Sequence, residues 1–406
     1  MNRMYARLFT VIIILICLTI VACGKSENLI IVDDKNVNML MYKELPGEFD
    51  QFLRIDDENY IFLKKTKGEA KIGIYSIDSG IILEKAIHET RAKNLVYDEK
   101  NQRVLLTISK LLPVFFEDEM NSVIAFDMDL NELWRIEVAP YIIDIVVDGK
   151  IYYIVCEEWP EVWSCDDPPS INTVVSKVDA DGKLIKAYRK NHFEYSQTII
   201  SESRSLICGT QTHNNKREAV LIEMDGAFFS ERHTILKNQD FVFGGVTEKD
   251  TLILMGAKGA PTAPFSIVNK TPKYYINIMN LNNLEIVRTI DVSRIFAQYD
   301  IFPRFIFYGE NKGRVALIAE IIFDEFLMDK GINLLFIPID SAYKLGDIYA
   351  FNVSDHTHLS VMDISESNNH FHIFALGVDY STSYEMSKRE NKSAILEFQI
   401  CIQNKT

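Results

Sequence analysis

Basic residues and long apolar runs are both scarce in this chain of 406 residues. There are 43 Lys and Arg against 57 Asp and Glu, which gives a formal net charge of −14. A nucleic-acid interface needs clustered Lys and Arg, so we expect no nucleic-acid partner. Uncharged apolar length is concentrated between Leu8 and Ala22, which excludes a protein with several membrane-spanning helices.

Cysteine is rare as well, with six in the whole chain, which excludes a miniprotein built on disulfides. Apolar residues make up 48% and charged residues 25%, the balance of an ordinary folded protein rather than a disordered one. Cys156 and Cys165 flank one loop and are the pair that we expect to form a disulfide. Cys208 and Cys401 lie in apolar, strand-like runs, where cysteine commonly serves as a small buried hydrophobe.

The amino terminus has the features of a secretory signal. Arg3 and Arg7 form a basic flank, and the uncharged stretch that follows is shorter than the roughly 20 residues that a spanning helix needs. Ile20, Val21, Ala22 and Cys23 then resemble a bacterial lipobox. The resemblance implies that Cys23 is lipidated and becomes the new amino terminus. An uncleaved signal anchor is the alternative.

We therefore predict three parts. Residues 1–22 are a lipoprotein signal peptide, residues 23–28 a lipidated tether, and residues 29–406 one folded domain. The predicted location is outside the cytoplasm, on a membrane, through the lipid; whether the membrane is inner or outer is left open.

The rest of the chain consists of short apolar runs separated by Asp, Asn, Gly and Lys turns, which is typical of strands and hairpins. One unit recurs about every fifty residues: a strand, a tight turn that begins with Asp or Asn, and a second strand. The turn residues are Asp78, Asp127, Asp179, Asp225, Asn280 and Asp340. This spacing suits the four-stranded blades of a β-propeller.

The two ends of the chain complete the count of blades. Residues 356–378 and 393–402 supply three strands, and the early segment 28–45 supplies a fourth. Closing a ring with a strand from the opposite terminus removes its open edges. The prediction is an all-β fold, a single β-propeller of seven four-stranded blades. Six blades are the alternative, if the amino-terminal segment packs elsewhere.

Two of the units carry a resemblance to a known family. Residues 124–138 have Ala125, Asp127 and Trp134 at the places found in blade repeats of quinoprotein-type propellers, and residues 175–188 are similar but lack the Trp. Such repeats occur in propeller lipoproteins of bacteria and in dehydrogenases that hold a quinone. The cofactor-binding residues of those dehydrogenases have no match here, so we predict no cofactor.

Five long insertions all fall between the second and third strands of their blades, and one-sided insertions of this kind often mark a binding face. Aromatic residues also fall in connections on this side: Trp159, Trp163, Phe193, Tyr195, Phe296 and Tyr299. We predict that these six contact a partner. For Trp159 and Trp163, inward packing beneath their own loop is an equal alternative.

Four of the eight histidines lie in one segment: His356, His358, His370 and His372. Pairing of two strands about a turn near Glu366 and Ser367 would place His372 opposite Val361, about 10 Å along the strand from His358. One tetrahedral site cannot use all four, so we predict no metal site. No nucleophile elbow, zinc-protease motif or phosphate-binding loop is present in the sequence.

These observations lead to a functional hypothesis. The chain is expected to be a lipid-anchored, non-catalytic binding or scaffold protein for a protein or an envelope polymer. The alternatives are an extracytoplasmic enzyme (a hydrolase, lyase or oxidoreductase) with its site in the central funnel, and a glycan-binding lipoprotein.

Overall fold

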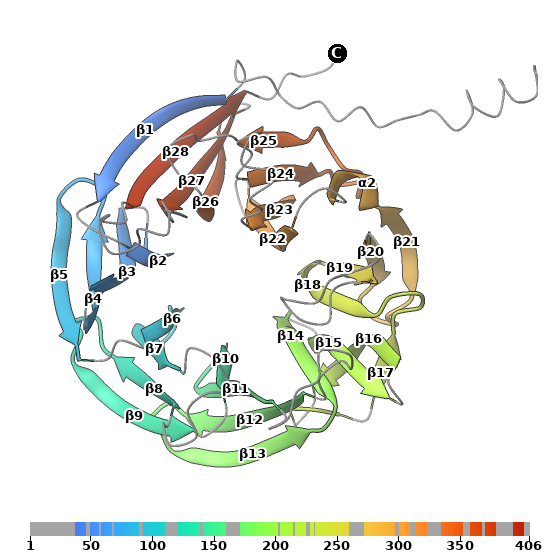
Figure 1. Cartoon of the computed structure of the whole chain (residues 1–406), viewed down its shortest axis with the longest axis horizontal. Helices are drawn as coiled ribbons and strands as arrows, with labels where there is room; N and C mark the ends of the chain where they lie inside the picture. Colours follow the sequence, from blue (N-terminus) through green and yellow to red (C-terminus); the bar gives the residue numbers. More distant parts are fainter. Residues whose placement is uncertain are drawn as a thin grey trace, which may run out of the picture.

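The fold is a ring of seven four-stranded antiparallel sheets (Figure 1), as a computed structural model shows. This confirms the predicted seven-bladed β-propeller. The structure describes residues 37–401 except for 46–48, 57, 67–68, 89–91, 110–120, 139–140, 160–170, 202–203, 214–215, 225–227, 231, 260–271, 297–299, 309–313, 323–333, 352–357, 368–369 and 379–392. Residues 1–36 lie outside the described part, and with them the predicted signal, lipidated Cys23 and tether.

Each blade has its strands in order from the axis outward. Blade 1 contains β2 (Phe49–Arg54), β3 (Asn59–Thr66), β4 (Glu69–Ser76) and β5 (Gly80–Ile87). Blade 2 contains β6 (Ala92–Asp98), β7 (Arg103–Ile108), β8 (Asn121–Phe126) and β9 (Glu132–Val138). Blade 3 contains β10 (Tyr141–Asp148), β11 (Ile151–Glu158), β12 (Asn172–Asp179) and β13 (Leu184–Lys190).

The other blades follow the same order. Blade 4 contains β14 (Phe193–Ile200), β15 (Ser205–His213), β16 (Lys216–Met224) and β17 (His233–Ile235). Blade 5 contains β18 (Phe241–Glu248), β19 (Thr251–Lys258), β20 (Lys273–Asn280) and β21 (Ile286–Asp291), and the short helix α2 (Ser293–Phe296) follows it. Blade 6 contains β22 (Asp300–Tyr308), β23 (Arg314–Ile322), β24 (Leu334–Ile339) and β25 (Tyr349–Phe351).

Blade 7 joins the two ends of the described chain. Its inner strands are β26 (His358–Ser367), β27 (His370–Val378) and β28 (Ser393–Cys401), and its outermost strand is β1 (Val37–Leu45). β1 pairs antiparallel with β28 from Val37 opposite Ile400 to Leu45 opposite Ser393. The predicted closure of the ring by an early strand is thus confirmed, and each of the seven blades has four paired strands.

The core lies between the blades, because each sheet is covered on both sides by its neighbours. Strands such as β8 and β11 are therefore buried along nearly their whole length. The outermost strands alternate between half-buried and exposed residues, as in β9. This division explains why the inner strands are almost continuously apolar in the sequence while the outer strands carry charge.

The recurring acidic turns have the predicted position, between the third and fourth strands of their blades. Asp127 Oδ1 accepts the N–H of Asn131 at 2.7 Å, and Asp340 Oδ1 accepts the N–H of Lys344 at 2.8 Å. Each carboxylate thereby closes its own turn, a frequent use of Asp. Asp225, one of the six predicted turn residues, lies outside the described residues.

Polar side chains near the axis join one blade to the next. The innermost strands of six blades are bulged near their first residues, for example between Phe49 and Gln51. A bulge re-aims a side chain. Gln51 Oε1 accepts the N–H of Leu95 in blade 2 at 2.7 Å, and Gln197 Oε1 accepts the N–H of Gly245 in blade 5 at 2.8 Å. These bonds fix the spacing of the blades beside the axis.

The predicted register of the histidine-rich hairpin is wrong. His372 lies opposite Ser365 and His358 opposite Val378, because β26 continues to Ser367 and β27 begins at His370. The two strands therefore still pair at Ser367 and His370, beyond the predicted turn near Glu366 and Ser367. His372 Nδ1 lies 3.0 Å from Glu397 Oε1 of the adjacent strand. Among the described residues, no group of three or more His, Cys, Asp or Glu is arranged to hold a metal ion.

Candidate functional site

The connections of the propeller leave the ring on two different faces. Strand direction alternates within a blade, so connections between the second and third strands leave the same face as those between successive blades. We call this side the loop face and the side of the tight hairpin turns the turn face. The five predicted insertions join the loop-face ends of second and third strands, and most of their residues lie outside the described part of the chain: 109–120, 159–171, 259–272, 323–333 and 379–392.

Three of the predicted partner-contacting aromatics are buried. The exposed fraction is 0% for Phe193 and Phe296 and 7% for Tyr195. Phe193 packs against Phe229, and Phe296 of α2 packs against Tyr274. The expectation that these three side chains face a partner is wrong. They fill the space between two neighbouring blades.

The other predicted aromatics have a different status. Trp159 is half-buried, and its Nε1–H donates to Oε2 of Glu157 at 3.2 Å. Trp163 and Tyr299 lie outside the described residues. Of the six predicted contacts, Trp159 is thus the one that the described structure leaves partly open to solvent on the loop face.

A charged cluster crosses the loop side of blades 3, 4 and 5. Glu157 of β11 is 8% exposed beneath Trp159. Glu194 of β14 accepts a hydrogen bond from Arg217 Nη2 of β16 at 2.6 Å, and the Arg217 side chain is 9% exposed. The Arg217 guanidinium also lies over the ring of Phe241 in blade 5, 5.5 Å from its centroid.

The burial of this cluster changes the protonation of its carboxyl groups. Burial, and then the negative charge of Glu194, raises the pKa of Glu157 to about 8, while Trp159 and Lys93 act in the opposite direction. Burial also raises the pKa of Glu194, against the lowering effect of Arg217. Glu157 is therefore a largely neutral carboxylic acid at neutral pH. Burial also raises the pKa of Asp144, while a hydrogen bond from the Tyr195 hydroxyl at 2.6 Å lowers it.

Beside this cluster, a pocket opens on the loop face between blades 4 and 5. Its volume is about 680 Å³.

 We call it the cationic pocket. Four of its lining residues are basic and two are acidic: Lys216, Arg217, Lys237, Lys258, Glu218 and Asp240. Ile235, Leu236, Asn238 and Gln239 complete the lining.

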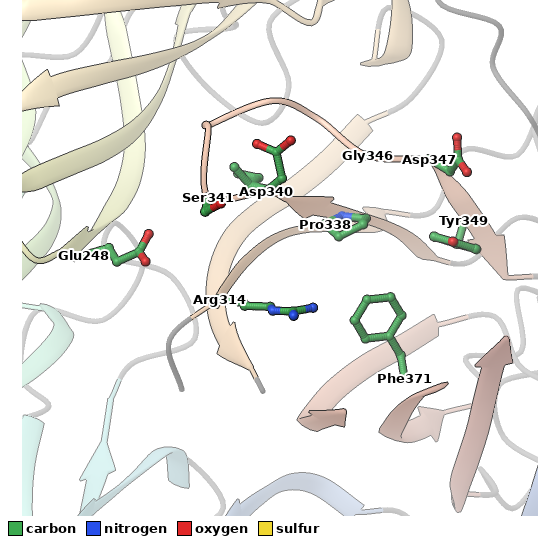
Figure 2. Close-up of a pocket in the computed structure, with 10 residues that line it drawn as sticks. Glu248, Arg314, Pro338, Asp340, Ser341, Gly346, Asp347, Tyr349 and Phe371 are labelled. Carbon is green, nitrogen blue, oxygen red and sulfur yellow. The ribbon is translucent and has the colours of Figure 1, made fainter. Parts of the chain in front are cut away.

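A second pocket lies on the turn face of blade 6, with a volume of about 420 Å³. Figure 2 shows Arg314 in this pocket between Glu248 on one side and Phe371 on the other. Asp340 and Asp347 add two more carboxyl groups to the lining. The two pockets therefore differ in face and in the sign of their surplus charge.

Both pockets occur where the outermost strand of a blade is only three residues long. β17 pairs with β16 at Val220–Ile222 only, which leaves the loop-face end of β16 without an outer strand. β25 pairs with β24 at Leu334–Phe336 only, which leaves the turn-face end of β24 open except for a single bridge at Ile339. The missing part of the outermost strand is what leaves room for each pocket.

The predicted disulfide stays a prediction. Cys156 is buried and forms no disulfide with another described cysteine, and burial raises the pKa of its thiol well above the ordinary value. Its predicted partner, Cys165, lies outside the described residues. Cys208 is also free and buried, as expected for a small apolar residue in a strand.

The membrane expectation concerns residues that the structure does not describe. In the described part of the chain, no helix has the length and apolar character needed to cross a membrane. Lipidation of Cys23 remains a prediction from the sequence.

The sequence reasoning missed the residues of the cationic pocket. Lys216 and Arg217 adjoin a two-residue hairpin connection, and Lys237 follows β17. A signal was present, because four basic residues fall within the short segments 216–217 and 232–237 of an acidic chain. What the sequence did not reveal is that β17 is too short to cover them.

No protein-family model matches this chain, and no curated protein matches it. Among solved structures, the chain is similar to the β-propeller domain of the Trilobed protease from Pyrococcus furiosus, with 12% identity over 88% of this chain and 96% of that one and a TM-score of 0.49. It is also similar to BamB from Moraxella catarrhalis, with 8% identity over 89% of this chain and 99% of that one and a TM-score of 0.49.

A third similar structure is the acylaminoacyl peptidase of Pyrococcus horikoshii. The identity is 12%, the match covers 81% of this chain and 49% of the peptidase, and the TM-score is 0.46. At such identities and scores these likenesses assign no activity, substrate or partner, and the function has to be argued from the site itself.

Proposed function

We propose that this chain is a binding protein, held on a bacterial membrane outside the cytoplasm by a lipid on Cys23, that captures a protein or an envelope polymer on its loop face. The observation that carries the proposal is the one-sidedness of the ring. Five long connections and the cationic pocket share the loop face, whereas most hairpins of the turn face are tight. In repeat proteins, insertions on one face often form the binding surface.

The position of β1 supports this arrangement. As an outermost strand, β1 runs from the turn face toward the loop face, so Val37 lies at the turn-face end of blade 7. The chain between Cys23 and Val37 spans at most about 50 Å when fully extended. A lipid on Cys23 would therefore attach the ring from its turn-face side and leave the loop face directed away from the membrane.

The burial of the charged cluster favours binding over catalysis at this place. A general acid must reach the reacting atom of a substrate, within about 3 Å. Glu157 is 8% exposed beneath Trp159, and Glu194 is engaged by Arg217. The two carboxyl groups therefore contribute to the structure of the loop face and do not present a reactive group to a ligand.

Exchange of one long connection tests the proposal. Residues 160–170 would be replaced by a Gly-Ser segment of equal length in the full chain, and the partner captured from an envelope extract would be quantified by mass spectrometry. We expect the captured amount to fall at least tenfold, because the exchange removes the loop-face side chains of blade 3.

The matched control is Arg314→Gln in the pocket of the turn face, which should capture as much partner as the wild type. Thermal unfolding of both variants verifies that the ring is intact. Capture that is undiminished by the exchange, or lost in the turn-face variant, would contradict the proposal.

A further inference from the structure

The cationic pocket has basic side chains that no described carboxylate neutralises. Lys216 Nζ pairs with Glu218 Oε1 at 2.7 Å, and Arg217 is engaged by Glu194. No salt bridge joins Lys237 or Lys258 to any residue in the described part of the chain, and both side chains are exposed. Two ammonium groups thus face the pocket of a protein whose net charge is −14.

The second carboxylate of the pocket, Asp240, is engaged by the backbone at the start of the 259–272 connection. Both oxygens of Asp240 accept the N–H of Gly259, at 3.0 and 2.8 Å. The segment that carries Lys237 and Asp240 is held in turn by Gln239, which forms two reciprocal amide hydrogen bonds with Asn277 of blade 5. The pocket is therefore preorganised, and its surplus charge is positive.

The wall of the pocket is the uncovered edge of a strand. β17 covers β16 at Val220–Ile222, and the backbone of Leu236 and Gln239 closes Ala219. Lys216, Arg217 and Glu218 have no outer strand among those described. An uncovered edge presents backbone N–H and C=O groups that an extended peptide can pair with.

An apolar side chain adjoins this edge. Ile235, the last residue of β17, is 45% exposed and lines the pocket. An extended peptide that continued the sheet beyond β17 would place one set of its side chains beside Ile235 and the alternate set on the opposite side of the sheet. The edge, the apolar contact and the two ammonium groups together fit a strand that alternates acidic and apolar residues.

We propose that the cationic pocket binds an extended acidic peptide segment, which adds to the edge of β16 and directs its carboxylates to Lys237 and Lys258. The inference deepens the proposed function, since it rests on the loop face being the binding face and gives the chemistry of its ligand. Anionic polymers without a peptide backbone match the charge but cannot use the strand edge.

The test uses the full chain and a fluorescent decapeptide of alternating Glu and Val, with fluorescence anisotropy as the readout. We expect this peptide to bind and its alternating Gln and Val counterpart to bind at least tenfold more weakly. Raising the salt concentration should weaken binding of the acidic peptide, because ammonium–carboxylate attraction is screened.

Three double variants, a methylated peptide and one competitor test the mechanism. Lys237→Gln with Lys258→Gln should weaken binding at least tenfold, whereas Lys237→Arg with Lys258→Arg keeps the charge and should stay within threefold of the wild type. Lys183→Gln with Lys186→Gln in blade 3 removes the same charge elsewhere and should have no effect. A peptide with alternate amides methylated should lose binding, and inorganic polyphosphate should compete poorly.

Failure to bind the acidic peptide, unchanged binding by the double Gln variant, full binding of the methylated peptide or strong competition by polyphosphate would each overturn the inference. These outcomes remain distinguishable from failure of the proposed function. Partner capture that depends on residues 160–170 would still support loop-face binding if the peptide did not bind.

Discussion

At the scale of single residues, two buried carboxyl groups of the loop face, Glu194 and Glu157, differ in whether a basic side chain neutralises them. Arg217 neutralises Glu194, but no basic side chain of the described residues forms a salt bridge with Glu157. Burial therefore keeps Glu157 largely protonated at neutral pH, with a pKa of about 8. Because the carboxyl group of Glu157 is neutral, it can stay buried beside Trp159 without leaving an unpaired charge.

This protonation makes stability depend on pH. The folded pKa of Glu157 is above its unfolded value of 4.5, so its contribution to the free energy of unfolding is fully present below pH 4.5 and is lost as the pH rises toward about 8. Glu157→Gln removes the titration. We expect the variant to gain stability relative to the wild type between pH 5 and pH 8, by at most about 1.4 kcal/mol per pH unit.

Urea unfolding of both proteins at pH 5 and at pH 8 measures this difference. Glu132→Gln, on an exposed part of β9, is the matched control and should show no comparable change between the two pH values. A Glu157→Gln difference that is equal at both pH values would contradict the assigned protonation.

At the scale of elements, five of the seven outermost strands have a bulge that exposes an apolar residue. The ladder between the third and fourth strands skips Leu40, Ile82, Leu133, Ile185 and Val287, and each of these is exposed. A bulge twists and interrupts an edge, which hinders pairing with another sheet. The exposed residue is thus a consequence of edge protection.

The residue after the bulge in blade 2 has a different role. Trp134 Nε1–H donates to the carbonyl of Ala180 in blade 3 at 2.9 Å, and a Cβ added to Gly182 would lie 2.6 Å from its ring. Trp134 therefore docks blade 2 onto the turn of blade 3. This is one of the positions that the sequence resemblance to quinoprotein-type repeats identified.

Adjacent substitutions in β9 separate these roles. Leu133→Ala should change the free energy of unfolding by less than about 0.5 kcal/mol, because its side chain is 45% exposed. Trp134→Ala should cost about 2–4 kcal/mol, because it removes a large ring and its hydrogen bond from the contact between two blades. Chemical denaturation measures both, and equal costs would contradict the docking role.

The same scale shows what the sequence could and could not predict. Strand periodicity and the Asp turns predicted the blades, because these signals are local. The burial of Phe193, at the start of β14, and of Phe296, in the helix before β22, was missed, because an aromatic at such a position has the same local sequence whether it faces solvent or a neighbouring blade. The cationic pocket was missed because it depends on the length of β17, and strand ends are weakly encoded.

At the scale of the whole molecule, the ring separates two surfaces. The early strand β1 closes blade 7, and its first residue lies on the turn-face side. The proposed lipid on Cys23 would therefore hold the turn face toward the membrane. The five long connections and the cationic pocket are on the other side.

Membrane attachment has a direct test. The full chain with Cys23→Ser should no longer sediment with the membranes of a bacterial host, whereas Cys17→Ser, which lies in the predicted signal, should sediment as the wild type does. Two or three acyl chains anchor a protein stably in a membrane, and the Cys23→Ser variant would carry none. Equal sedimentation of the Cys23→Ser variant would contradict lipidation.

Site-specific photo-crosslinking in the cell tests the central claim, that partners bind the loop face, most directly. A photoreactive amino acid would be placed at Lys237 on the loop face or at Asp347 on the turn face, and crosslinked products would be compared after ultraviolet exposure. The account predicts a discrete crosslinked partner from position 237 and none of that size from position 347. A partner crosslinked from position 347 alone would contradict it.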